Sequence, residues 1–96
     1  MPAYFLVEIL EINDPDRYSE YIAGVKEIVQ GYDGEYVIRT DHISLFFGES
    51  WPVRIILIKF EDTKSLEKCF NSDEYKKLAP LREASTKARA FVVEEG

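Results

Sequence analysis

Two strand-like segments, Ala3–Ile12 and Val53–Glu61, carry apolar side chains on both of their faces. Successive side chains of a strand point to opposite faces of its sheet, so a strand with one face in water alternates apolar with polar residues. Neither segment follows that alternation. In the first, the two faces carry Phe5, Val7 and Ile9 against Tyr4, Leu6 and Leu10, and in the second they carry Val53, Ile55 and Leu57 against Arg54, Ile56, Ile58 and Phe60. A sheet built on these strands must therefore be covered on both faces.

The residues between these two segments predict a helix and a hairpin. Asp14–Pro15 is typical of a helix start, and aromatic or branched residues follow at spacings of three and four as far as Gly31. Short strands are expected at Glu35–Thr40 and Ile43–Phe47, joined by a tight turn at Asp41–His42. The apolar segment that follows is expected to be central in the sheet, because it has no polar face.

The last third of the chain predicts two short helices and a strand. Either residue of Asp62–Thr63 can cap the first helix, and Asn71–Glu74 has the spacing of a capping box for the second. Pro80 is expected to kink or break the second helix, since it removes an amide donor. A final strand is expected over Lys87–Glu94.

This order of elements predicts a ferredoxin-like α+β domain over residues 1–96, with the pattern βαββαβ, an antiparallel sheet and the helices on one face. The helices leave the other face bare, and burying several hundred Å² there at roughly 25 cal/mol per Å² is worth on the order of 10 kcal/mol. A second copy related by a two-fold axis is the simplest cover, because such an interface is self-complementary. We therefore predict a homodimer through the sheet face, which forms a dimeric α+β barrel.

The charge balance and the single cysteine limit the expected partners and location. The chain has 12 Lys and Arg against 18 Asp and Glu, and its net charge of -6 repels nucleic acid and anionic membranes. Cys69 is the only cysteine, so no internal disulfide and no multi-thiolate metal site can form. The first residues do not resemble a signal peptide, and no apolar stretch approaches membrane-spanning length. We expect a cytoplasmic protein that binds neither nucleic acid nor membranes.

Several short motifs follow one another in an order found in one group of small domains. They are Asp14–Pro15 with Tyr18 and Tyr21, Gly31–Gly34, Tyr36–Arg39, Arg54, Phe60, Asn71–Tyr75, Leu81–Arg82 and Phe91–Glu94. With these motifs the chain resembles, from its first strand to its last residues, the uncharacterised family catalogued as domain of unknown function 1330. After Arg39 that family usually has a glycine-rich turn, whereas Thr40, Asp41 and His42 stand here.

The resemblance implies a branch of the dimeric α+β barrel superfamily, in agreement with the pattern of elements. Other branches of that superfamily include cofactor-free monooxygenases, lactone isomerases and haem-dependent chlorite-degrading enzymes. Such different reactions on one fold mean that the resemblance implies no particular reaction here, and function must be argued from the site.

Two groups of residues are candidates for holding an anionic ligand. Arg39 follows Val37 on one face of an apolar strand, where a buried guanidinium needs a carboxylate from the protein or from a ligand. Alternatively, Arg39 lies at a strand end in water or pairs with a Glu. Tyr75 and Arg82 are seven residues apart and fall on one helix face, with Ser72 one turn earlier. Alternatively, Ser72 caps the helix, Tyr75 packs in the core and Arg82 forms a surface ion pair.

Four further residues have candidate roles. His42 is the only histidine, and imidazole is the usual general base near neutral pH, but a histidine in a turn is commonly just solvated. Tyr18 is the other catalytic candidate, and it can equally pack the helix against the sheet. Trp51 lies in a loop, where it can close over a pocket or pack on the partner subunit. Cys69 lies on an apolar helix stripe and is expected to be a buried, inert thiol.

Two functions are compatible with these candidates. The first is a domain that binds, or transforms without a cofactor, a small acidic or aromatic metabolite held by Arg39, Tyr75 and Arg82. The alternative is a non-catalytic dimeric module with a structural or stress-related role. The sequence offers no ligand set for haem or zinc, so neither a cofactor nor a metal is expected. Whether the protein is an enzyme is left open by the sequence.

Overall fold

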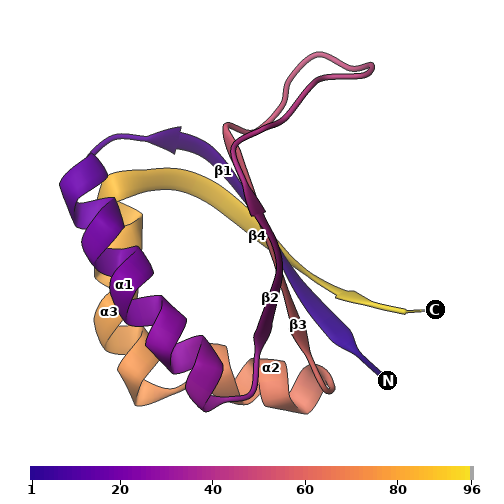
Figure 1. The fold of residues 1–96 in the computed structure, drawn as a ribbon. Helices are drawn as coiled ribbons and strands as arrows, with labels where there is room; N and C mark the ends of the chain where they lie inside the picture. Colours follow the sequence, from indigo (N-terminus) through magenta and orange to yellow (C-terminus); the bar gives the residue numbers. More distant parts are fainter. Residues whose placement is uncertain (96) are drawn as a thin grey trace.

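A four-stranded antiparallel sheet carries three helices on one of its faces within residues 1–95, which the computed structural model describes (Figure 1). In chain order the elements are β1 (Ala3–Ile12), α1 (Pro15–Gly31), β2 (Glu35–Thr40), β3 (Arg54–Phe60), α2 (Thr63–Phe70), α3 (Asp73–Ser85) and β4 (Thr86–Glu94). The strand order across the sheet is β2-β3-β1-β4, and every neighbouring pair is antiparallel. The α+β class, the antiparallel sheet and the central position of β3 confirm the prediction.

Each helix begins at a side chain that accepts a hydrogen bond from the first turn. An Asp14 carboxylate oxygen accepts from the Arg17 amide at 3.2 Å, and Asp62 accepts from the Ser65 amide at 2.8 Å. The third helix was expected to begin at Asn71, but its cap is Ser72, and Asn71 ends α2 instead. Ser72 takes this place because its Oγ also donates to the carbonyl of Cys69 at 2.7 Å, which links the two helices.

The predicted strand Ile43–Phe47 is wrong, and so is the tight turn at Asp41–His42. Residues 41–53 form a loop that extends away from the helices (Figure 1), and at its tip Phe46 and Phe47 are 94% and 85% exposed. A two-residue hairpin favours residues with positive φ, which neither Asp41 nor His42 adopts here. The strand β2 pairs with β3 instead, where alternate apolar side chains pack against the helices.

Pro80 does not break its helix, which was one of the two outcomes expected for it. α3 continues from Asp73 to Ser85 through Pro80. Proline removes the amide that would bond to the carbonyl of Lys76, but Pro80 is exposed, so water can reach this side of the helix.

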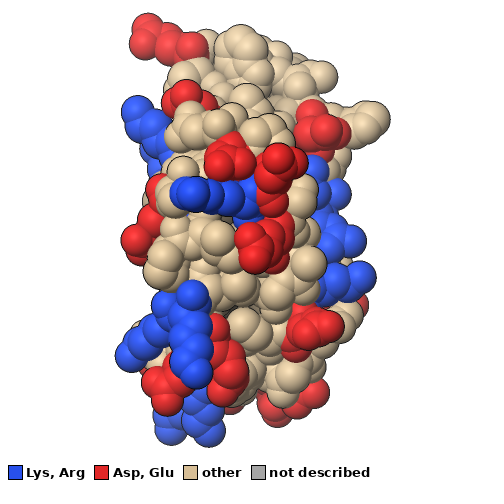
Figure 2. Space-filling model, turned by 90° about the vertical axis from the view of Figure 1, so that its left-hand side faces the viewer, with Lys and Arg blue, Asp and Glu red and all other residues tan. Residues whose placement is uncertain are grey.

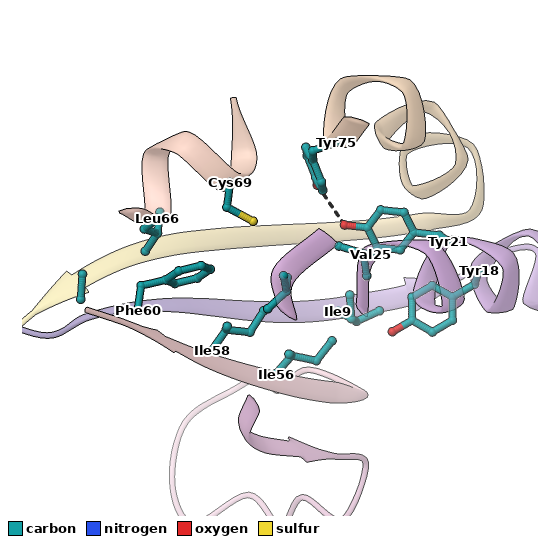
Figure 3. Packing of buried hydrophobic residues seen from close by; sticks show 12 residues of the cluster. Ile9, Tyr18, Tyr21, Val25, Ile56, Ile58, Phe60, Leu66, Cys69 and Tyr75 are labelled. Carbon is teal, nitrogen blue, oxygen red and sulfur yellow. Dashed lines mark hydrogen bonds between the residues drawn. The ribbon is translucent and has the colours of Figure 1, made fainter. Parts of the chain in front are cut away.

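The core lies between the helices and the inner face of the sheet (Figure 3). Its fully buried side chains include Ile9, Val29, Phe60 and Cys69. Burial, with a smaller contribution from the Glu74 charge, raises the pKa of the Cys69 thiol to about 11. The thiol is therefore buried and protonated at neutral pH, as the sequence predicted.

The outer face of the sheet is apolar as well. The strand register places Ile38, Leu57, Leu6 and Phe91 in one row that crosses β2, β3, β1 and β4. Ile38 and Phe91 are exposed, and the loop of residues 41–53 projects toward this same side of the sheet (Figure 1). The helical side is different, because positive and negative side chains are interspersed over it (Figure 2).

Candidate functional site

A cavity of about 260 Å³ lies between the helices and the inner face of the sheet. The edge strand β4 leaves this space because Ala88 and Ala90 stand at inner positions, opposite Ile9 and Val7 of β1. Most of its wall is apolar, and Phe5 and Val7 are only half-buried as a result. Ala90 is exposed, so the cavity reaches solvent along this edge of the sheet.

One polar region of the wall joins α1 to α3. Tyr21 of α1 and Tyr75 of α3 point toward each other (Figure 3). Their hydroxyl oxygens lie 2.9 Å apart in a buried hydrogen bond. Arg82, two turns after Tyr75, donates its Nε hydrogen to the Tyr75 hydroxyl at 3.3 Å. The three side chains form a continuous polar chain in an apolar wall.

The ionisation of these groups follows from their surroundings. Burial, and then the neighbouring Tyr75, raise the pKa of Tyr21 far above its ordinary value. Burial alone would lower the pKa of Arg82, but its contacts with Tyr75, Tyr21 and Glu83 outweigh this effect and raise it. At neutral pH the site therefore holds a protonated Tyr21 phenol beside a charged guanidinium.

A second polar region lies beside the cavity at its β2–β3 side. Tyr18 lines the cavity, and its hydroxyl points toward the sheet next to Ile56, away from the Tyr21–Tyr75 pair (Figure 3). Neither this hydroxyl nor the Nε of Arg54 has a hydrogen-bond partner within residues 1–95, and both atoms are buried. Burial raises the pKa of Tyr18, although the charge of Arg54 opposes this.

Arg39 contacts the cavity only through a neighbour. Its guanidinium carbon lies 5.0 Å from the ring centroid of Tyr36, which lines the cavity. Neither Arg39 nor Arg54 forms an ion pair with a carboxylate of residues 1–95. The inner face beside the cavity therefore carries unneutralised positive charge, in a protein whose net charge is -6.

The structure brings Tyr18, Tyr75 and Arg82 to one cavity, and it places the other predicted site residues elsewhere. Ser72 is buried, and its Oγ accepts a hydrogen bond from the Tyr75 amide at 3.2 Å. It therefore caps the helix, which is the alternative role considered for it. His42 lies in the loop of residues 41–53, where 93% of its side chain is exposed beside Asp41. Trp51 lies in the same loop, and neither residue lines the cavity.

Two functional candidates were missed from the sequence. Tyr21 was given no role in the site, although a phenol on the buried face of a helix generally needs a polar partner. Arg54 was read as part of a strand pattern and given no role. The register of β3 against β1 places the Nε of Arg54 where it has no hydrogen-bond partner within residues 1–95, and the sequence does not reveal this register.

The family of the chain follows from a comparison with known families. A family model described as Domain of unknown function (DUF1330) matches residues 2–96. The chain belongs to this family. No curated protein matches the chain significantly. Among residues 1–95, no helix is long and apolar enough to cross a membrane, and no group of three or more His, Cys, Asp or Glu side chains is arranged to hold a metal ion.

Solved structures resemble this member of the DUF1330 family over nearly its whole length. The RPA0582 protein of unknown function from Rhodopseudomonas palustris has 14% identity and a TM-score of 0.78, over 98% of this chain and 82% of that chain. A dimeric ferredoxin-like protein of unknown function from Jannaschia sp. CCS1 has 15% identity and a TM-score of 0.75, over 99% of this chain and 100% of that chain.

The third structure is SnoaB, a cofactor-independent oxygenase from Streptomyces nogalater. It has 10% identity and a TM-score of 0.71, over 99% of this chain and 93% of that chain. At these identities the likeness shows the fold alone, and it confirms the predicted ferredoxin-like architecture.

Proposed function

We propose that this protein binds a small acidic or aromatic metabolite in the cavity between its helices and its sheet. The observation that carries this proposal is the cavity itself, whose apolar wall contains one short chain of polar groups, Tyr21, Tyr75 and Arg82. Ligand sites generally combine an apolar lining with a few polar groups that orient the ligand. At about 260 Å³ the space suits a small molecule.

The cost in stability of an empty apolar cavity supports the proposal that a molecule binds there. A closed apolar cavity of about 260 Å³ would destabilise a fold by about 6 kcal/mol at roughly 24 cal/mol per Å³. The opening at Ala90 lowers this penalty because water can enter, but the apolar wall offers water few hydrogen bonds. A bound molecule would replace that water with apolar contacts.

A cofactor-independent reaction on the bound molecule is the second candidate function. It is supported by the polar chain in the wall and by the likeness of the fold to SnoaB, an oxygenase of this kind. However, the pKa values of Tyr18 and Tyr21 are raised, mainly by burial, so both phenols stay protonated at neutral pH. They can donate hydrogen bonds but are poor general bases, and the geometry therefore favours binding over proton abstraction.

The proposal includes a homodimer that forms through the outer face of the sheet. The apolar row Ile38, Leu57, Leu6 and Phe91 supports it, because a face of this kind is rarely left in water. Phe46 and Phe47 are exposed in the loop that projects toward the same side, where they can contact a second copy. The Jannaschia protein of similar fold is described as dimeric.

The proposal also covers domain organisation, cellular location and macromolecular partners. The 96 residues act as one domain in the cytoplasm, where the single thiol of Cys69 stays reduced. The net charge of -6 disfavours nucleic acid as a partner.

A cavity-filling substitution tests the binding site. Ala90→Phe places a large side chain in the cavity, whereas Ala23→Phe places the same side chain on an exposed position of α1 outside it. The neutral fluorophore 1-aminoanthracene should bind the wild type and Ala23→Phe with increased fluorescence, and Ala90→Phe should bind it at least tenfold more weakly. Equal binding by all three proteins would contradict the proposal. Native mass spectrometry of the purified wild type would identify a retained metabolite.

A further inference from the structure

The Tyr21–Tyr75 pair has one hydroxyl hydrogen more than the protein can use. A phenol donates one hydrogen and accepts through its oxygen. The Tyr75 oxygen already accepts from Arg82, and one of the two phenols donates to the other. Whichever phenol donates, the hydrogen of the other phenol has no acceptor among residues 1–95. The pair therefore always keeps one unused donor, and buried donors are rarely left unpaired.

The charges around the cavity indicate what kind of acceptor suits this donor. Among the residues that line the cavity only Arg82 and Arg89 are charged, and the Arg89 side chain lies on the outer face of the sheet; no Asp or Glu lines the cavity. Arg89 is neutralised by Glu8 across the outer face. Arg82 has only Glu83 near it, at 3.7 Å from its Nη2, which is too long for a hydrogen bond. The unused phenolic hydrogen thus lies beside a guanidinium with incomplete neutralisation.

We propose that the cavity selects an apolar carboxylate, whose oxygen accepts the unused hydrogen of the Tyr21–Tyr75 pair while Arg82 neutralises its charge. This inference rests on the proposed function of the cavity, and it adds Tyr21 as a residue that determines specificity. A hydrogen bond from a neutral donor to a charged acceptor is stronger than one between neutral groups. The apolar wall holds the body of the molecule, and the exposed edge at Ala90 admits it.

Two ligands of nearly equal shape test the charge. 2-Naphthoate and its neutral amide, 2-naphthamide, compete with 1-aminoanthracene, and direct titration calorimetry with naphthoate provides a second readout. Wild type should bind naphthoate about tenfold or more tightly than the amide, since charged acceptors strengthen hydrogen bonds. Arg82→Gln should remove most of this preference. Lys26→Gln changes the net charge equally at an exposed position of α1 outside the cavity, and it should keep this preference.

The number of phenolic hydrogens in the Tyr21–Tyr75 pair leads to a second prediction. In Tyr21→Phe the Tyr75 hydroxyl keeps its hydrogen free for the ligand, so the preference for naphthoate should fall less than about threefold. In the double variant Tyr21→Phe/Tyr75→Phe no phenolic hydrogen remains, and the preference should fall about tenfold. Tyr32→Phe removes a hydroxyl outside the cavity and is the matched control. Circular dichroism and thermal unfolding report whether each variant is folded.

The outcomes separate this inference from the proposed function. If 1-aminoanthracene binds but naphthoate and naphthamide bind equally well, the carboxylate inference is wrong and the cavity remains a binding site. If Tyr21→Phe loses as much of the preference for naphthoate as the double variant does, the inference is also wrong. The free hydrogen of Tyr75 should preserve that preference in Tyr21→Phe. If neither 1-aminoanthracene nor naphthoate binds, the inference and the proposed function are both wrong. If the double variant does not fold, the comparison of Arg82→Gln with Lys26→Gln still decides the question.

Discussion

The hydroxyl oxygens of Tyr21 and Tyr75 lie 2.9 Å apart, although the two residues are separated by 54 positions in the chain. Their rings meet edge to face, with centroids 6.3 Å apart. This contact joins α1 to α3 at the cavity wall. It places two polar groups in a wall that is otherwise mostly apolar.

We expect this hydrogen bond to appear in a double-mutant cycle of stability. Tyr21→Phe should lower the free energy of unfolding by about 1 kcal/mol. Tyr75→Phe should lower it more, because it also leaves the Arg82 Nε hydrogen without a partner. Urea unfolding should give a coupling energy of about 0.5–1.5 kcal/mol between the two positions. If the effects of the two substitutions simply add, the contact does not contribute to stability.

Gly34 is expected to tolerate no side chain. A Cβ at this position would lie 2.6 Å from Cγ1 of Val29 and 2.9 Å from Cε1 of Phe60, both in the core. Gly34→Ala should therefore destabilise the protein by about 1–3 kcal/mol through overpacking. Gly31→Ala is the control, because nothing lies within 4 Å of a Cβ there. Comparable urea midpoints for the two variants would contradict this account of the turn between α1 and β2.

Alkaline pH should destabilise the fold through Cys69. The pKa of this thiol is raised, by burial first, from an ordinary value of 9.0 to about 11 in the folded protein. Between these values the unfolded chain loses the proton while the folded protein retains it. The free energy of unfolding should therefore fall as pH rises from about 9 to about 11, and it should fall less steeply in Cys69→Ala.

The buried tyrosines add to this loss of stability at high pH, so the difference between wild type and Cys69→Ala is the informative quantity. Iodoacetamide gives an independent check. At pH 8 it should alkylate the unfolded protein far faster than the native one, because Cys69 is 0% exposed. Equal alkylation rates would show that the native thiol is accessible.

Phe91 offers a test of the proposed dimer. It lies on β4 at the end of the apolar row on the outer face, and it is 45% exposed in the single chain. Phe91→Asp would bury a charge in each half of the interface and should weaken dimerisation at least about 100-fold. Ala23→Asp adds the same charge on the helical side as a control.

Light scattering at micromolar concentration measures the outcome. Wild type and Ala23→Asp should have the mass of two chains, and Phe91→Asp should have the mass of one. A wild type with the mass of one chain would contradict the dimer, whatever the variants do.

The sequence predicted those parts of the fold that depend on local patterns. The lack of a polar face on β3 predicted its central position, and Asp14 and the pair Asp62–Thr63 marked two helix starts correctly. The strand predicted at Ile43–Phe47 was wrong, because an apolar run does not reveal whether a partner strand is available to it. Here β2 pairs with β3, and the run forms the tip of a loop.

The candidate site was predictable only in part, for a similar reason. Tyr75 and Arg82 lie on one helix face, and their spacing placed them together. The contact of Tyr75 with Tyr21 depends on how α1 packs on α3, which no local spacing contains. The unpartnered Arg54 depends on strand register, and the exposure of His42 depends on the loop that replaced the predicted hairpin.

The size of the cavity depends on two small side chains of the edge strand, Ala88 and Ala90. A single base change converts an alanine codon into a valine codon, and such a change here would shrink the space without altering the helices or the central strands. Under the proposed function, the size of the ligand that fits can therefore change in small genetic steps. The polar groups that join α1 to α3 lie elsewhere in the fold, so the volume of the cavity can change while these groups are maintained.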